Sequence, residues 1–111
     1  MKFTTILLAL GTTAPAVLAA DMDLVDMWVD TNFNGPKYTG RGDVGQCVNL
    51  PSNFNDNLSS GKARPGYKCT IWPDADCKTN RFDSSFDDKG SGASFPDWIN
   101  DRASSWRCYR A

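Results

Sequence analysis

Two six-residue segments of the chain are rich in oxygen donors. Residues 55–60 read Asn-Asp-Asn-Leu-Ser-Ser, and residues 100–105 read Asn-Asp-Arg-Ala-Ser-Ser. Such segments bring carboxylates, amides, hydroxyls and main-chain carbonyls together, and a hard cation such as Ca²⁺ takes about six to eight oxygen ligands in flexible geometry. The same residue types also favour turns through local hydrogen bonds. Composition alone therefore leaves metal binding and simple turn formation open.

Other catalytic and metal chemistry finds little support. The chain has no histidine, which excludes Ser-His-Asp and Cys-His catalysis. A Ser-Lys site and a carboxylate pair stay open. Asp74 with Asp76, or Asp87 with Asp88, could form such a pair, but aspartate is also a common turn residue. The four cysteines include no CxxC pair, so a zinc site is disfavoured. We predict that the chain is not an enzyme.

The charge balance excludes two classes of partner. The sequence has 12 Lys and Arg against 13 acidic residues, all of them aspartate, for a net charge of −1. A chain so close to neutral has no electrostatic footprint for nucleic acid or for anionic membranes. No apolar run after residue 20 approaches the roughly 20 residues that a membrane span requires. We therefore expect neither a nucleic-acid partner nor a membrane span.

The N-terminus has the layout of a secretory signal peptide. Lys2 supplies a positive charge, residues 3–10 are mostly apolar, and the segment ends in Ala19 and Ala20. We predict that residues 1–20 are removed and that residues 21–111 form one secreted, extracellular domain. An even number of cysteines in a small secreted domain predicts two disulfides. Their spacing alone leaves all three connectivities open.

Alternating side chains predict short strands. Within residues 25–30, Val25, Met27 and Val29 would share one face, and residues 68–72 alternate in the same way. Glycine, proline, asparagine and aspartate punctuate the sequence between such runs. Several short strands separated by turns indicate an all-β sandwich or barrel.

An internal repeat divides the chain into two similar halves. Residues 28–33 align with residues 72–77 at an offset of 44, and residues 50–60 align with residues 95–105 at an offset of 45. Two matching blocks in the same order point to a duplicated structural unit. Two such units are too few for a solenoid, so they must bury their apolar faces against each other.

These residues resemble a single βγ-crystallin domain. Trp28, Phe33 and Gly35 match the aromatic corner of that family, although the second half has Cys77 and Thr79 at the corresponding positions. The family's calcium signature, Asn/Asp-Asn/Asp-x-x-Ser/Thr-Ser, occurs in both halves. The resemblance implies an all-β, disulfide-stapled β-sandwich of two Greek-key motifs, the first at about residues 22–62 and the second at about residues 65–110.

The resemblance also implies a ligand set for two calcium ions, each shared between the two signature loops. Side-chain oxygens are expected from one aspartate and one serine of each loop, and main-chain carbonyls from the residue after each aspartate. In this chain these residues are Asp56, Asn57, Ser59, Asp101, Arg102 and Ser104. The last serine of each signature is expected to bond the main chain and hold its loop.

The family topology further implies the disulfide pairing. The third strand of one half joins the sheet of the other half, beside its last strand. That arrangement implies the pairs Cys47–Cys108 and Cys69–Cys77.

Three functions follow from the resemblance. The first is a secreted structural or stress-type domain that binds calcium and is stabilised by it. The alternatives are a secreted toxin, antimicrobial or effector protein of the same fold, and an extracellular peptidase inhibitor with residues 59–66, including Arg64, as its inhibitory loop. The sequence names no macromolecular target.

Two surface features accompany these hypotheses. Asn57-Leu58-Ser59 is a sequon for an N-glycan at Asn57. Trp98 precedes the second signature, and is the best candidate among the tryptophans for a surface that stacks on sugars.

Overall fold

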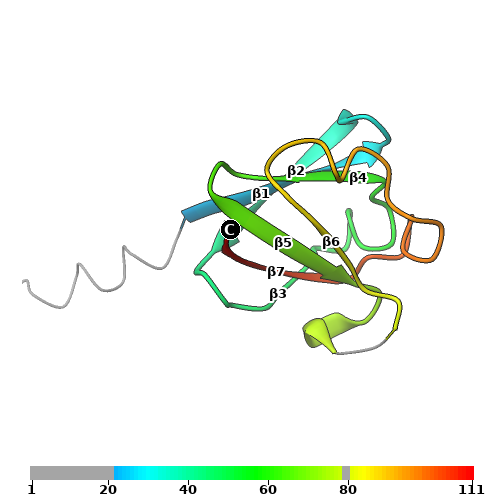
Figure 1. Cartoon of the computed structure of the whole chain (residues 1–111). Coiled ribbons are helices and arrows are strands. Elements are labelled where there is room, and N and C mark those ends of the chain that lie inside the picture. The colour runs from blue at the N-terminus through cyan, green and yellow to red at the C-terminus, as the bar shows by residue number, and fades with distance from the viewer. Residues whose placement is uncertain (1–21, 79–80) are drawn as a thin grey trace, which may run out of the picture.

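The computed structural model describes residues 22–78 and 81–111, so the predicted signal peptide lies outside the described residues. Within them the chain forms two sheets, ordered β2-β1-β4 and β3-β7-β5-β6 (Figure 1). The strands and the one 3₁₀ turn are β1 (Met22–Asp30), β2 (Asn34–Gly42), β3 (Val48–Asn49), β4 (Ser60–Ala63), β5 (Tyr67–Trp72), η2 (Ala75–Cys77), β6 (Ser84–Phe86) and β7 (Ser105–Arg110). The all-β, two-sheet prediction is confirmed. No helix in the described ranges is long and apolar enough to cross a membrane.

Residues 25–30, where alternating side chains predict a strand, lie in β1, the central strand of the first sheet. Val25 and Met27 are fully buried, whereas Val29 is only partly buried. β1 pairs with β2 on one side and with β4 on the other, both antiparallel. Gly40 faces Val25 across the β1–β2 pair, and a Cβ there would lie 2.6 Å from both Val25 and the Trp106 ring. The tight packing at this point therefore requires glycine.

Trp106 is the largest fully buried side chain in the core between the two sheets. Its indole Nε1 donates a hydrogen bond of 3.0 Å to the hydroxyl of Tyr38, so its one polar group is satisfied. Burial raises the pKa of Tyr38, although the bond from Trp106 opposes that shift. Burying a large apolar side chain contributes about 1.5–3 kcal/mol.

Each half of the chain supplies a segment to the sheet of the other half. β3 of the first half pairs with β7 of the second, with Val48 opposite Trp106. In the other direction, Gly61 of β4 donates its N–H to the carbonyl of Gly92 at 2.9 Å. The predicted exchange of third strands is confirmed for β3, and it prevents the halves from separating as independent units.

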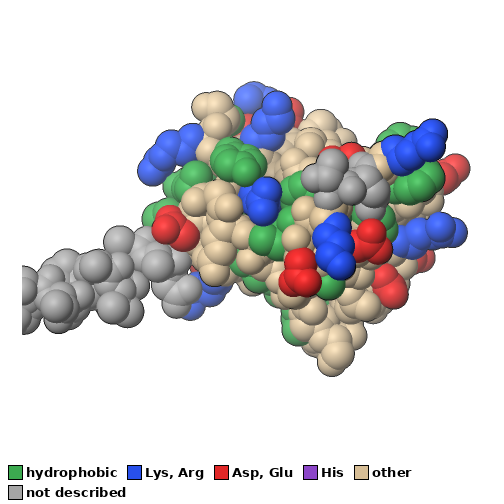
Figure 2. All heavy atoms as spheres, turned by 90° about the horizontal axis from the view of Figure 1, so that it is seen from below, with side chains coloured by type: hydrophobic (Ala, Val, Ile, Leu, Met, Phe, Trp, Pro, Cys, Tyr) green, Lys and Arg blue, Asp and Glu red, His purple; other side chains and the backbone are tan. Residues whose placement is uncertain are grey.

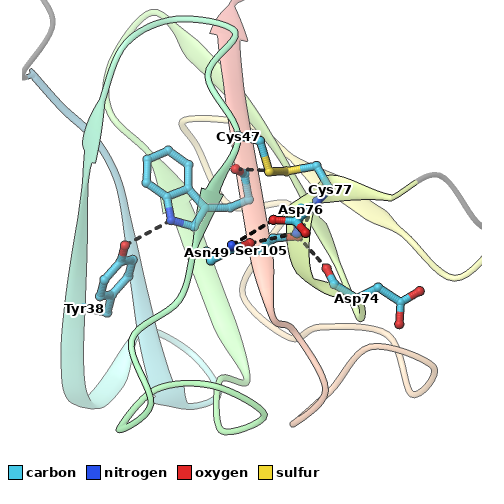
Figure 3. The surroundings of a disulfide bond; sticks show 8 residues. Tyr38, Cys47, Asn49, Asp74, Asp76, Cys77 and Ser105 are labelled. Carbon is cyan, nitrogen blue, oxygen red and sulfur yellow. Dashed lines mark hydrogen bonds between the residues drawn. A yellow bond between two sulfur atoms is a disulfide. The ribbon is translucent and has the colours of Figure 1, made fainter.

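The disulfides are Cys47–Cys77 and Cys69–Cys108, so the predicted pairing is wrong. Cys69 and Cys108 lie directly opposite each other in the β5–β7 ladder, with Cα atoms 4.0 Å apart. Because Val48 pairs with Trp106, Cys47 falls one residue short of Cys108 in the register. Neighbouring positions on a strand point to opposite faces, so Cys47 turns away from Cys108 and meets Cys77 of η2 instead (Figure 3).

The two bridges constrain different parts of the fold. Cys47–Cys77 joins the first half to the second across 30 residues, and Cys69–Cys108 joins two strands of the second half across 39 residues. In the chain-entropy model, each contributes about 3.5–4 kcal/mol by restricting the unfolded state.

Gly92 provides a sharp test of the strand exchange. A Cβ at Gly92 would collide with the main-chain oxygen of Gly61 and with the ring of Phe86, whereas a Cβ at Gly90 would meet no atom within 4 Å. We expect Gly92→Ala to lower the free energy of unfolding in urea by about 1–3 kcal/mol. The matched Gly90→Ala control should change it by less than about 0.5 kcal/mol. Equal effects of the two substitutions would contradict the packing described here.

Candidate functional site

The two signature loops lie antiparallel and bond each other through the main chain. The N–H of Asp56 donates to the carbonyl of Ala103, and the N–H of Asp101 donates to the carbonyl of Leu58, both at 3.0 Å. Leu58 and Ala103 are fully buried, so the apolar residue inside each signature anchors its loop in the core. These reciprocal bonds relate the loops by a local pseudo-twofold axis.

Each loop is shaped by the same local contacts. The carbonyls of Pro51 and Pro96 each accept bonds from two N–H groups, those of residues 54 and 55 in one loop and of residues 99 and 100 in the other. Asp56 and Asp101 then adopt positive φ angles of 61° and 59°. Aspartate and asparagine tolerate this left-handed conformation better than most residues, which explains their place in the turn.

The serine and aspartate side chains of the two loops meet in two crossed pairs. Ser59 Oγ lies 3.3 Å from Asp101 Oδ1, and Ser104 Oγ lies 3.4 Å from Asp56 Oδ1. Both aspartates are exposed, whereas Ser59 is buried and Ser104 partly buried. The structure therefore brings four of the six predicted ligands together, and each pair draws on both loops.

The donor chemistry of each crossed pair fits a calcium ion. Each pair offers one carboxylate and one hydroxyl, and hard cations accept such oxygens together with carbonyls and water. Among the described residues no group of three or more His, Cys, Asp or Glu side chains gathers as a metal centre. A site with one carboxylate has low ligand charge, which suits weak calcium binding. The side chains of Asn57 and Arg102 are exposed, and ligation through their carbonyls stays a prediction.

The last serine of each signature bonds the main chain, as expected. Ser60 Oγ accepts the N–H of Phe33 at 3.1 Å and donates to the carbonyl of Asp30 at 2.6 Å. Ser105 Oγ accepts the N–H of Cys77 at 3.0 Å and donates to the carbonyl of Asp74 at 2.6 Å. Both serines are fully buried. We call each of these arrangements a serine clamp.

The clamps hold two corners of the chain, residues 30–33 in the first half and residues 74–77 in the second. Different side chains secure the two corners. Phe33 packs against Trp28 edge to face, with ring centroids 5.2 Å apart. Cys77 takes the same place in the second half, with a φ of 51° against 62° for Phe33, and its side chain is bonded to Cys47. The disulfide thus replaces the aromatic contact that secures the first corner.

Three of the four aspartates that the sequence left open as catalytic candidates, Asp76, Asp87 and Asp88, make structural hydrogen bonds. Asp76 exchanges two hydrogen bonds with Asn49, of 3.0 Å and 2.7 Å (Figure 3). The N–H of Lys89 lowers the pKa of Asp87, and the N–H of Gly66 lowers the pKa of Asp88. Figure 2 shows basic and acidic side chains interspersed over the visible face.

Residues 59–66 do not form the free loop considered for peptidase inhibition. β4 occupies the middle half of the segment and pairs with β1. Arg64 donates its N–H to the carbonyl of Leu24, and its guanidinium lies 3.0 Å from a carboxylate oxygen of Asp26. Because its main chain and side chain are both engaged, Arg64 is not presented as a bait residue.

Two further predicted surface residues are exposed. Trp98 is 48% exposed, and its Nε1 donates to the carbonyl of Asp83 at 3.2 Å, which fixes the orientation of the ring. Asn57 is exposed. The Asn49–Asp76 link was missed by sequence reasoning, because nothing in the spacing of two isolated polar residues signals such a contact.

The comparisons with known proteins define the family. The model of peptidase inhibitor family I36 matches residues 27–85, more than half of the chain. The chain belongs to this family. A comparison of this chain's sequence with curated proteins gives no match.

Solved structures identify the fold of this I36 domain. A βγ-crystallin domain from Flavobacterium johnsoniae superimposes with a TM-score of 0.60 at 21% identity, covering 79% of this chain and 96% of that chain. A βγ-crystallin domain from Clostridium beijerinckii gives a TM-score of 0.61 at 16% identity, covering 78% and 97%. The domain of Abundant Perithecial Protein from Neurospora crassa, solved in its Ca²⁺-bound form, gives 0.57 at 19% identity, covering 79% and 89%. The predicted βγ-crystallin fold is confirmed.

The serine clamps yield a stability prediction. Replacing Ser60 or Ser105 by alanine leaves a buried N–H and a buried carbonyl without their partner. We expect each substitution to lower the free energy of unfolding by about 1–3 kcal/mol, because unsatisfied buried polar groups carry their full desolvation cost. Urea unfolding measures the change, with Ser52→Ala at an exposed position as the control. Losses no larger than that of the control would show that the clamps are dispensable.

Proposed function

We propose that this chain is a secreted, calcium-binding βγ-crystallin domain, and that calcium stabilises its fold. The observation that carries the proposal is the crossed arrangement of Ser59 with Asp101 and of Ser104 with Asp56. Two such pairs related by a pseudo-twofold axis would hold two ions. The proposal is for a binding function and assigns no catalytic role to the chain.

The ligand set supports modest affinity. Each pair contributes one carboxylate, so the remaining ligands are neutral oxygens, including the proposed carbonyls of Asn57 and Arg102. Extracellular modules with low ligand charge bind calcium with dissociation constants of about 10⁻⁴–10⁻³ M. At a free calcium concentration ten times the dissociation constant, each site would stabilise the native state by about 1.4 kcal/mol.

Three further observations support the proposal. Abundant Perithecial Protein of Neurospora crassa, which shares the fold, has been solved in its Ca²⁺-bound form. Two disulfides close the domain, and such bridges persist in oxidising compartments, in keeping with the predicted signal peptide. Asn57 is exposed, so in a glycosylating secretory pathway an N-glycan there would project from the calcium loops into solvent.

Calcium-dependent thermal unfolding tests the proposal. We expect calcium to raise the unfolding midpoint of the disulfide-intact domain and to leave that of an Asp56→Gly/Asp101→Gly variant unchanged. Glycine keeps the positive φ at both positions without strain, so the variant removes the carboxylates and preserves the loops. Asp97→Ala, at an exposed position outside the signatures, is the control. An equal calcium-induced shift in the parent and the double variant would place calcium elsewhere.

Inhibition of an extracellular peptidase is the second candidate function. The family match supports it, because the matched model is that of a peptidase inhibitor family. The inhibitory surface must lie outside residues 59–66, where Arg64 is paired and β4 lies within a sheet. No contact or comparison favours a toxin or an effector over these two functions.

A panel of metallo- and serine peptidases tests this candidate. We expect the oxidised domain to inhibit at least one of them with a dissociation constant below about 10⁻⁶ M, and to remain intact during the assay. Mass spectrometry of the recovered chain separates inhibition from simple competition by a cleaved substrate. No inhibition across the panel, or rapid cleavage of the chain, would contradict the candidate.

A further inference from the structure

The two corners are equivalent in geometry but not in their sensitivity to reduction. In the first half the corner is secured by the Trp28–Phe33 ring contact and the Ser60 clamp. In the second half the aromatic contact is replaced by the Cys47–Cys77 disulfide, beside the Ser105 clamp. A reductant can therefore open the second corner and has no corresponding target in the first.

The second corner supports one of the two crossed pairs directly. Ser105, which bonds both ends of the corner, is the immediate neighbour of Ser104, and Ser104 Oγ reaches Asp56. In the same way Ser60 adjoins Ser59, which reaches Asp101. Each corner thus positions the serine of one crossed pair. The corner that contains Phe33 positions Ser59, which faces Asp101. The corner that contains Cys77 positions Ser104, which faces Asp56.

Beside the disulfide and the clamp, hydrogen bonds to Asn49 also hold the second corner. The two hydrogen bonds between Asn49 and Asp76 are exposed and so compete with water, which leaves each a small net contribution. Cys77 Sγ lies 3.4 Å from the carbonyl oxygen of Trp106. Without the bond to Cys47, the side chain of Cys77 would be a small thiol, and only its N–H would still bond the Ser105 clamp.

The two disulfides also differ in access. Cys69 and Cys108 are 1% and 0% exposed, whereas Cys47 is partly exposed and Cys77 is 6% exposed. Thiol–disulfide exchange requires that the attacking thiolate reach a sulfur atom. Mild reduction should therefore act on Cys47–Cys77 before it acts on Cys69–Cys108.

We propose that the Cys47–Cys77 disulfide is a redox switch for calcium binding at the Ser104–Asp56 pair, while the Ser59–Asp101 pair is insensitive to it. The inference rests on the proposed calcium-binding function and adds its regulation. The oxidised domain binds two ions with similar affinity. The domain reduced at this one bridge keeps the Ser59–Asp101 site and loses affinity at the other.

A dithiol is the chemical class of reductant that the switch requires. Its thiolate attacks Cys47 Sγ, the Sγ–Sγ bond breaks, and Cys77 leaves as a thiolate that takes up a proton. The second thiol of the reductant then displaces Cys47 and closes the reductant into its own disulfide. Two electrons and two protons pass to the domain, and both cysteines end as thiols.

Calorimetric titration with calcium alone tests the switch. Cys47→Ser/Cys77→Ser mimics the reduced corner and keeps Cys69–Cys108. We expect the oxidised parent to bind two calcium ions per chain with similar affinity. In the double serine variant we expect one unchanged site and one weakened at least about tenfold, the effect typical of removing support behind a metal ligand. Cys47→Ser/Cys77→Phe, which copies the first corner, should restore the second site.

Two glycine substitutions in the double serine background assign the surviving site. Asp101→Gly should abolish binding at the strong site, and Asp56→Gly should leave it intact. Two unchanged sites in the double serine variant would overturn the switch and leave calcium binding standing, as would loss of both sites together. No binding to the oxidised parent would overturn the proposed function and the switch with it.

Discussion

Two buried serine hydroxyls connect the irregular parts of this domain to its sheets. Ser60 and Ser105 each stand at the first residue of a strand, and each bonds an N–H and a carbonyl in the corner that follows the first strand of its half. A corner with positive φ angles leaves main-chain groups that no ladder can satisfy. Because the clamp satisfies them, the corner folds over the sheet, and the neighbouring Ser59 and Ser104 are held where they face the aspartates of the opposite loop.

Duplication allows the two halves to serve as controls for each other. The clamps, the reciprocal loop bonds and the crossed pairs recur at offsets of 44 or 45 residues, so they belong to the shared unit. The differences are confined to particular positions. Cys77 replaces Phe33 and converts a packing contact into a covalent bond between the halves. Exposed Trp98 has no aromatic counterpart at Asn53 in the first loop. The loops thus share one geometry while their supports differ.

Much of the fold could be predicted because it depends on local patterns. Alternation in residues 25–30 predicted β1, the repeat predicted two equivalent halves, and the resemblance placed β3 beside β7. The disulfides could not be paired, because the choice depends on a register that differs by one residue and reverses the face on which Cys47 lies. Arg64 was expected in an exposed inhibitory loop because of the family resemblance. Its pairing with Asp26 brings together residues 38 positions apart, which no local pattern reveals.

The most direct test of the calcium site is a crystal structure of the oxidised domain grown with calcium. The account predicts two ions near the pseudo-twofold axis, each about 2.3–2.6 Å from its oxygen ligands. One ion should contact Asp56 and Ser104, and the other Asp101 and Ser59. An ion held by the aspartate and serine of a single loop, or loops that bind no ion at saturating calcium, would contradict the crossed site.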